Sequence, residues 1–184
     1  EQKNIKIVLF DMEGTLFQGV GTRADGMPST SAWALLAERM GTEVNAAEFE
    51  NYKKWQRGEY SSYSAWMEDT SRLFKKEGMT KDFFDATLDS IDYFPGVKEA
   101  LSTLHERGIH TGVITGGFYE LAERALRDLG LHHAYASSRY FWDKNEKLSH
   151  WELEEHGLEG KIHAAKKITS IYDVPLENCA FVGD

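Results

Sequence analysis

The chain has 184 residues, 41% of them hydrophobic, and a formal net charge of −9 at pH 7. This length suffices for one substantial hydrophobic core, or for one core with a small accessory domain. The acidic balance, without a basic stripe, argues against a general nucleic-acid binder, because such proteins neutralise phosphates with clustered lysine and arginine.

Membrane and export segments are not apparent in the sequence. No apolar stretch approaches the ~20 residues that a membrane-spanning helix requires, and the N-terminal residues lack the pattern of an export signal. The single cysteine, Cys179, excludes an internal disulfide and is typical of a reducing compartment. Its apolar neighbours favour a buried structural thiol. We therefore expect a cytoplasmic protein without a membrane partner.

The first predicted element is a short buried strand at Ile5–Phe10, which leads directly into the segment Asp11–Thr15. Two carboxylates, Asp11 and Glu13, thus follow a buried strand. Ligands of open α/β sheets bind at the carboxyl edge of the strands. This segment is therefore the first candidate for an active site, with an acidic nucleophile and an acidic proton donor.

Residues 17–92 show helix signals and no strand signals. After a loop at residues 21–31, capping residues and apolar periodicity predict four helices. Their ranges are Ser31–Met40, Asn45–Gly58 with Asn45 as the N-cap, Ser62–Glu77 and Thr80–Ile91. The segment also contains five aromatic residues that we expect to cluster: Tyr52, Trp55, Tyr60, Tyr63 and Trp66. We interpret it as a helical-bundle cap, in which these rings pack the bundle and some line a substrate pocket.

Alternating strand and helix signals resume after residue 92. Helices are predicted at 95–107, 117–129 and 160–172. Strands are predicted at Thr111–Ile114, Ala134–Ala136 and Cys179–Val182, and a hairpin joins 140–142 to 148–153. This alternation predicts a parallel sheet with right-handed crossovers.

The predicted fold class is therefore α/β, with a doubly wound, Rossmann-like core. We assign residues 1–16 and 93–184 to this core and residues 17–92 to the inserted cap. The sequence ends at Asp184, directly after a strand. A sheet of this kind normally continues, so we expect the natural chain to extend further.

Four motifs follow the predicted strands and helices in a recognisable order. They are Asp11-Met-Glu-Gly-Thr15, Val113-Ile-Thr-Gly-Gly-Phe118, Lys161 and Val182-Gly-Asp184. In a parallel sheet the carboxyl ends of the strands share one edge, so these segments should converge. The set resembles the haloacid dehalogenase-like superfamily, and within it the phosphoserine phosphatase-like branch. Four motifs in order are a far more specific signal than any one of them.

The resemblance implies a phosphomonoesterase that acts on a small phosphorylated metabolite. Asp11 would be the nucleophile and would form an aspartyl-phosphate. Glu13 would protonate the leaving group and then activate water. Thr115, the N–H groups around Gly116 at a helix start, and Lys161 would bind the phosphate. Lys161 is preferred over Lys166 and Lys167, which lie in mid-helix.

The resemblance also implies a Mg²⁺ cofactor, bound by the carboxylates of Asp11 and Asp184 and by the backbone carbonyl of Glu13. Glu13 departs from the family, which usually has Asp at this position. Two alternatives remain open. One is a phosphotransferase of the same fold, because the choice between water and another acceptor depends on cap closure and water exclusion. The other, suggested by Glu13, is a catalytically weak member that binds a phosphorylated ligand or a partner.

The substrate is a separate question. Counting along the motifs places the two residues that would recognise phosphoserine at Val20 and Met67, neither of which can pair with a charged group. Arg23, Arg57 or Arg72 could replace them from another direction. We expect phosphoserine to be a poor substrate and a neutral or aromatic alcohol moiety to be better tolerated. The oligomeric state is not indicated by the sequence.

Overall fold

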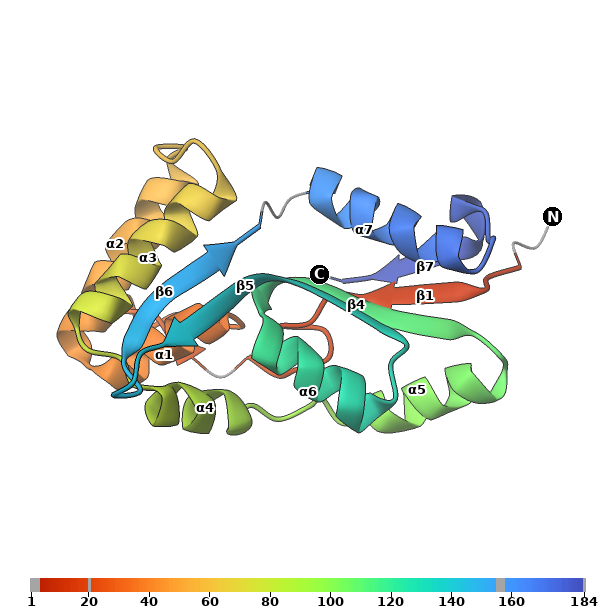
Figure 1. The fold of residues 1–184 in the computed structure, drawn as a ribbon, viewed down its shortest axis with the longest axis horizontal. Helices are drawn as coiled ribbons and strands as arrows, with labels where there is room; N and C mark the ends of the chain where they lie inside the picture. Colours follow the sequence, from red (N-terminus) through yellow and green to blue (C-terminus); the bar gives the residue numbers. More distant parts are fainter. Residues whose placement is uncertain (1–3, 20, 155–157, 184) are drawn as a thin grey trace.

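A computed structural model describes residues 4–19, 21–154 and 158–183. Its main feature is a five-stranded sheet in the order β6-β5-β4-β1-β7 (Figure 1). The strands are β1 (Ile7–Phe10), β4 (His110–Phe118), β5 (His133–Trp142), β6 (Leu148–Leu153) and β7 (Cys179–Val182). β7, β1, β4 and β5 run parallel, and β6 is antiparallel to β5.

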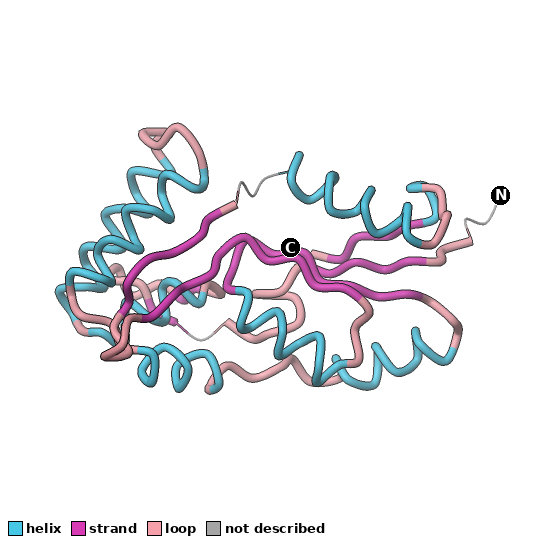
Figure 2. Tube along the Cα trace, viewed as in Figure 1, coloured by secondary structure: helices cyan, strands magenta, loops and turns pink. Residues whose placement is uncertain are grey.

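Helices cover both faces of this sheet, which confirms the predicted doubly wound α/β fold. α5 (Val97–Glu106) and α6 (Tyr119–Leu129) lie on one face, and α7 (Leu158–Ile171) lies on the other (Figures 1 and 2). All four residues of β1 are buried. A parallel strand that is covered on both faces requires such a continuous apolar run.

The register brings three strand ends together. Phe10 pairs with Val113 of β4 on one side and with Val182 of β7 on the other. The residues that follow Phe10 and Val182 therefore emerge at the same edge as the second half of β4. The sequence predicted this convergence at one edge. The edge faces the inserted helices (Figure 1).

The inserted segment contains four helices and a short hairpin. The helices are α1 (Ala32–Met40), α2 (Thr42–Gln56), α3 (Tyr63–Lys76) and α4 (Lys81–Asp89), and β2 (Gly21–Thr22) pairs with β3 (Pro28–Ser29). The predicted capping role of Thr80 is confirmed, because its side chain accepts the backbone N–H of Phe83. Ser31 and Ser62, where two of the predicted ranges begin, cap α1 and α3 in the same way.

The predicted N-cap at Asn45 is wrong. α2 begins at Thr42, because Gly41 ends α1 and starts α2 at once with a backbone φ of 125°. This positive φ suits glycine, which has no Cβ. The Asn45 side chain instead donates to the carbonyl of Thr22 at 3.0 Å, so it ties α2 to β2.

Two strands are longer than predicted. β4 continues to Phe118, so Gly116 and Gly117 lie in the strand rather than at a helix start, and α6 begins at Tyr119. The predicted strands at Ala134–Ala136 and 140–142 form one strand, β5. It pairs with β4 in its first half and with β6 in its second. The predicted hairpin turn between β5 and β6 is confirmed.

The β5–β6 hairpin extends from the sheet to the inserted helices (Figure 1). Tyr140 of β5 shares a 2.9 Å hydrogen bond with Ser71 of α3, and the indole of Trp151 donates to Glu68 at 2.5 Å. A single apolar cluster runs from the sheet through α1, α3 and α4. The division into residues 17–92 and the remainder stays a prediction, and the hairpin packs with the helices.

The two connections between the sheet and the inserted segment lie side by side. Phe17 and Tyr93 stack with their ring centroids 4.4 Å apart, and the Gln18 N–H donates to the carbonyl of Asp92 at 2.9 Å. The Arg124 guanidinium of α6 donates to the carbonyl of Ile91 at 2.7 Å. These contacts hold the two connections together, and we call this contact region the joint.

Within residues 4–19, 21–154 and 158–183, none of the helices combines the length and the apolar character that crossing a bilayer requires.

Candidate active site

Asp11 lies at the carboxyl end of β1 and forms an ion pair across the sheet edge. The Nζ atom of Lys161, near the start of α7, is 2.7 Å from Asp11 Oδ2. The other carboxylate oxygen, Oδ1, accepts the backbone N–H of Met12 at 2.8 Å. The two side chains are 19% and 24% exposed, respectively, so solvent screens the pair only in part. The structure thus brings together two predicted residues that are far apart in sequence.

Glu13 lies beside Asp11, and its carboxyl group is enclosed by the inserted helices. Its Oε1 atom accepts the backbone N–H of Ala32, at the start of α1, at 2.5 Å. Burial raises the pKa of Glu13 to about 7, the Asp11 charge adds to the rise, and the Ala32 N–H opposes it. A carboxyl group with a pKa near neutral can both give and accept a proton.

Thr115 and the two glycines after it form a tight backbone segment next to Glu13. Thr115 is 2% exposed, and its Oγ1 atom accepts the N–H of Gly117 at 2.9 Å. A Cβ atom at Gly117 would lie only 2.8 Å from Glu13 Oε2. Only glycine allows the backbone to pass this close to the carboxylate. The hydroxyl proton of Thr115 is left to donate to another acceptor.

A cavity of about 230 Å³ connects these groups. Its floor contains Asp11, Glu13, Thr115, Gly116 and Gly117, and the side toward the inserted helices consists of Thr30, Ser31, Trp33, Tyr63, Trp66 and Met67. The structure therefore places Met67 beside the candidate site, whereas Val20 lies outside the described residues.

Most of the predicted aromatic cluster forms behind the side of the cavity that the inserted helices provide. Trp66 stacks on Trp55 with centroids 5.3 Å apart and also contacts Tyr52 and Tyr63. Tyr60 uses its hydroxyl to bind Asp69 at the surface. Tyr63 and Trp66 thus serve both roles that the sequence suggested, packing the bundle and lining the cavity.

Several cavity residues were not predicted from the sequence. Trp33, Ser31 and Thr30 reach the site only because α1 packs over Glu13. Two serines of β5 support the floor from behind, where Ser137 donates to the carbonyl of Thr115 and Ser138 to that of Gly116. No local sequence pattern marks a serine that hydrogen-bonds to a neighbouring strand in this way, so these two contacts are seen only in the folded chain.

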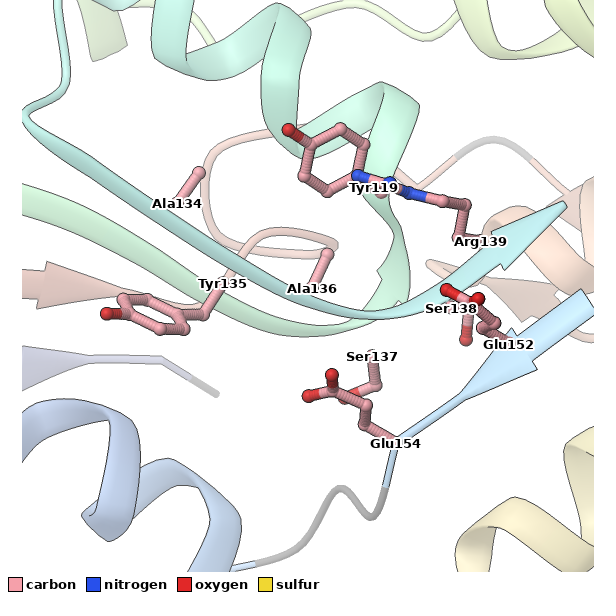
Figure 3. Close-up of a pocket in the computed structure, with 9 residues that line it drawn as sticks. All are labelled: Tyr119, Ala134, Tyr135, Ala136, Ser137, Ser138, Arg139, Glu152 and Glu154. Carbon is pink, nitrogen blue, oxygen red and sulfur yellow. The ribbon is translucent and has the colours of Figure 1, made fainter. Parts of the chain in front are cut away.

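A second cavity, of about 270 Å³, lies along β5 (Figure 3). Ser137, Ser138, Glu152 and Glu154 line it, and the Arg139 guanidinium lies 3.8 Å from the centre of the Tyr119 ring. The carboxylates of Glu152 and Glu154 make this cavity unsuited to a phosphate.

The expected metal site is described only in part, because Asp184 lies outside the described residues. A Cβ atom at Gly183 would lie 3.3 Å from the Asp11 Cβ atom, so the chain passes directly beside Asp11 just before residue 184. Within residues 4–19, 21–154 and 158–183, no group of three or more His, Cys, Asp or Glu residues could bind a metal. The carboxylate of Asp11 is a hard oxygen donor of the type that Mg²⁺ prefers.

Comparisons with known proteins agree with this fold. The chain is 26% identical over 149 residues to phosphoserine phosphatase of Streptococcus thermophilus, covering 78% of this chain and 61% of that protein. It is 30% identical over 128 residues to phosphoserine phosphatase of Lactococcus lactis, covering 61% and 58%. The chain thus spans about three fifths of these curated relatives.

Solved structures show the same architecture. A HAD family hydrolase from Salmonella enterica serovar Typhi superposes with a TM-score of 0.80 at 17% identity, covering 97% of this chain and 55% of that one. A substrate-bound phosphoserine phosphatase gives a TM-score of 0.78 at 23% identity, with 100% and 79% covered. The family model for haloacid dehalogenase-like hydrolases matches residues 5–184. The chain therefore belongs to the haloacid dehalogenase-like hydrolase family.

Proposed function

We propose that this protein is a Mg²⁺-dependent phosphomonoesterase that works through an aspartyl-phosphate on Asp11. The observation that supports the proposal best is that Asp11 pairs with the Lys161 ammonium and shares the floor of one cavity with the enclosed Glu13 carboxyl. A nucleophile, a cation and a near-neutral acid are the groups that this reaction needs.

Charge is the first obstacle to the reaction, because a phosphate dianion repels the Asp11 carboxylate. The Lys161 ammonium, 2.7 Å from Asp11 Oδ2, offsets part of this repulsion. The Thr115 hydroxyl can donate to a phosphate oxygen. Mg²⁺, bound by Asp11, the Glu13 carbonyl and Asp184, would neutralise further phosphate charge.

Proton transfer is assigned to Glu13. In the first step, an Asp11 oxygen forms a bond to phosphorus while the bond from phosphorus to the leaving oxygen breaks, and protonated Glu13 gives its proton to that oxygen. In the second step, water attacks phosphorus, the bond to Asp11 breaks, and Glu13 takes the proton of the water. The pKa of about 7 makes both forms of Glu13 available at neutral pH.

We further propose that the substrate is a phosphorylated neutral or aromatic alcohol. Among the described residues that line the cavity, only Asp11 and Glu13 carry a charge. The arginines that might bind a substrate carboxylate have other partners. Arg23 stacks on Tyr52, Arg57 pairs with Glu59, and Arg72 pairs with Glu68. A buried charged head group without a partner costs several kcal/mol.

The proposal is tested by assaying hydrolysis of an aryl phosphate with and without Mg²⁺. We expect excess chelator to abolish activity, and Mg²⁺ to restore it better than Ca²⁺, whose looser coordination fits the octahedral geometry poorly. Rapid quenching followed by peptide mass spectrometry should locate the phosphoryl group on Asp11. Full activity in chelator, or a phosphoryl group on another residue, would refute the proposal.

A further inference from the structure

The carbonyl oxygen of Gly116 accepts two hydroxyl donors from opposite sides. The Ser138 Oγ atom of β5 donates at 3.2 Å, and the Tyr63 hydroxyl of α3 donates at 3.2 Å. A carbonyl oxygen has two lone pairs, so these two bonds use its full accepting capacity. One donor belongs to the sheet and the other to the inserted helices.

These hydroxyls act where the regular ladder is interrupted. The pairing of β4 with β5 shifts register between Thr115 and Phe118. A register shift disrupts the ladder locally, so backbone groups there need other partners. Side chains supply them, with Ser137 binding the Thr115 carbonyl at 3.3 Å.

The peptide unit between Gly116 and Gly117 links Tyr63 to Thr115, because its carbonyl and its N–H are both hydrogen-bonded. The Gly116 carbonyl and the Gly117 N–H belong to the same planar trans peptide and point in opposite directions. The Gly117 N–H donates to Thr115 Oγ1 at 2.9 Å. The order of donors is therefore Tyr63 hydroxyl, peptide 116–117 and Thr115 hydroxyl. Each bond in such a chain polarises the next, so donation by Tyr63 strengthens donation by Thr115.

The surroundings of Tyr63 keep its hydroxyl in the donor role. Its ring packs edge-on against Trp66 and Trp55, with centroids 5.7 and 6.1 Å away. Burial raises the pKa of the Tyr63 phenol above its ordinary value, and the charges of Glu13 and Asp11 add to the rise. The phenol therefore stays protonated at neutral pH.

We propose that Tyr63 is a positioning residue that acts through peptide 116–117 on the Thr115 hydroxyl, and so sets how strongly the site binds a phosphate group. This inference rests on the proposed function and deepens it. Because Tyr63 lies at the start of α3, it makes phosphate binding depend on the inserted helices. Its phenol ring also lines the cavity, but the role assigned here belongs to the hydroxyl.

The test is the affinity of inorganic phosphate, measured by calorimetry in the presence of Mg²⁺, because this readout does not require turnover. Tyr63→Phe removes the hydroxyl and keeps the ring. Because polarisation along a hydrogen-bond chain strengthens each bond by roughly 10–30%, and the Thr115 bond to phosphate is charge-assisted, we expect phosphate affinity to fall by about 1.3- to 4.6-fold. Ser138→Ala removes the other donor to the same carbonyl from the sheet side, and we expect a loss of similar size.

A double-mutant cycle distinguishes an effect through this chain of hydrogen bonds from a general loss of structure. In a Thr115→Ala background the chain lacks the hydroxyl that would bind phosphate, so adding Tyr63→Phe should leave phosphate affinity unchanged. Thr115→Ser, which keeps the hydroxyl, should restore the sensitivity to Tyr63→Phe. Melting temperatures of all variants control for folding.

Three outcomes would overturn the inference. The first is wild-type phosphate affinity in Tyr63→Phe, and the second is an equal loss with and without the Thr115 hydroxyl. Either would leave the phosphatase proposal intact, because turnover and the phosphoryl group on Asp11 are measured separately. The third is an unmodified chain that neither binds phosphate nor hydrolyses an aryl phosphate, which would overturn both.

Discussion

Replacing Glu48 by glutamine should change how stability depends on pH. Glu48 lies in α2 and is only 3% exposed. Its Oε2 atom has no hydrogen-bond partner among the described residues. Burial raises the pKa of Glu48 from 4.5 to about 7, although the nearby Arg23 charge opposes the rise. The folded protein therefore favours the neutral carboxyl group.

The sign and size of the effect follow from this shift. Consider an acid whose pKa is higher in the folded state than in the unfolded state. At pH values below the unfolded-state pKa, this acid does not destabilise the folded protein. The loss of folding stability grows as the pH rises through the interval from 4.5 to about 7, and it reaches its full size above that interval. Such a shift corresponds to roughly 3 kcal/mol. Glutamine cannot ionise, so Glu48→Gln removes this cost.

Urea unfolding at pH values from 5 to 8, followed by tryptophan fluorescence, measures the effect. Glu13 also titrates in this interval, so only the difference between Glu48→Gln and the unmodified chain isolates Glu48. We expect this difference to grow between pH 5 and pH 8 by roughly 2.5 kcal/mol in favour of the variant. Glu43→Gln, at an exposed position of the same helix, should give a difference that stays constant. A constant difference for Glu48→Gln as well would show that the buried carboxyl group does not carry this cost.

Further predictions concern catalysis and the joint. Glu13→Gln should slow turnover by about 10²–10⁴-fold, most strongly for poor leaving groups, and equal slowing across leaving groups would contradict its role as proton donor. Asp11→Asn should lower kcat by several orders of magnitude with the fold intact, and a much smaller loss would remove Asp11 as nucleophile. In steady-state assays phosphoserine should be a poor substrate beside phosphorylated neutral alcohols, and a kcat/KM of ~10⁴ M⁻¹s⁻¹ or more, well above theirs, would refute this. Arg124→Met leaves the Ile91 carbonyl without its guanidinium donor and should lower the free energy of unfolding by about 1.5–3 kcal/mol, which urea titration can check.

Local signals predicted local structure well. Ser62 and Thr80 start their helices because a side-chain oxygen accepts an N–H within the same turn, which the sequence alone can indicate. Asn45 has the same capability, yet Gly41 turns the chain three residues earlier, and Thr22 offers Asn45 a different partner. A capping residue is therefore informative only when no competing turn or tertiary acceptor intervenes.

The candidate site shows the same division. The proximity of Asp11 and Lys161 was predicted from strand order and family resemblance, because parallel strands bring their carboxyl ends to one edge. The bond from Ala32 to Glu13 was not predictable, since it depends on how α1 packs against the sheet. Gly116 was expected at a helix start, but pairing with β5 extends β4 through it. The pattern of a single sequence does not indicate which distant segments will come into contact.

The joint formed by Gln18 and Asp92 has a consequence for protein engineering. Because the two chain crossings are hydrogen-bonded neighbours, a short turn could replace everything between them without displacing β1 or α5. Excision would nevertheless strip the cover from Tyr140 and Trp142, whose rings pack against Phe84 of α4. A chimera that carries a different inserted segment must therefore exchange two pieces of sequence together, the helical segment and the β5–β6 hairpin.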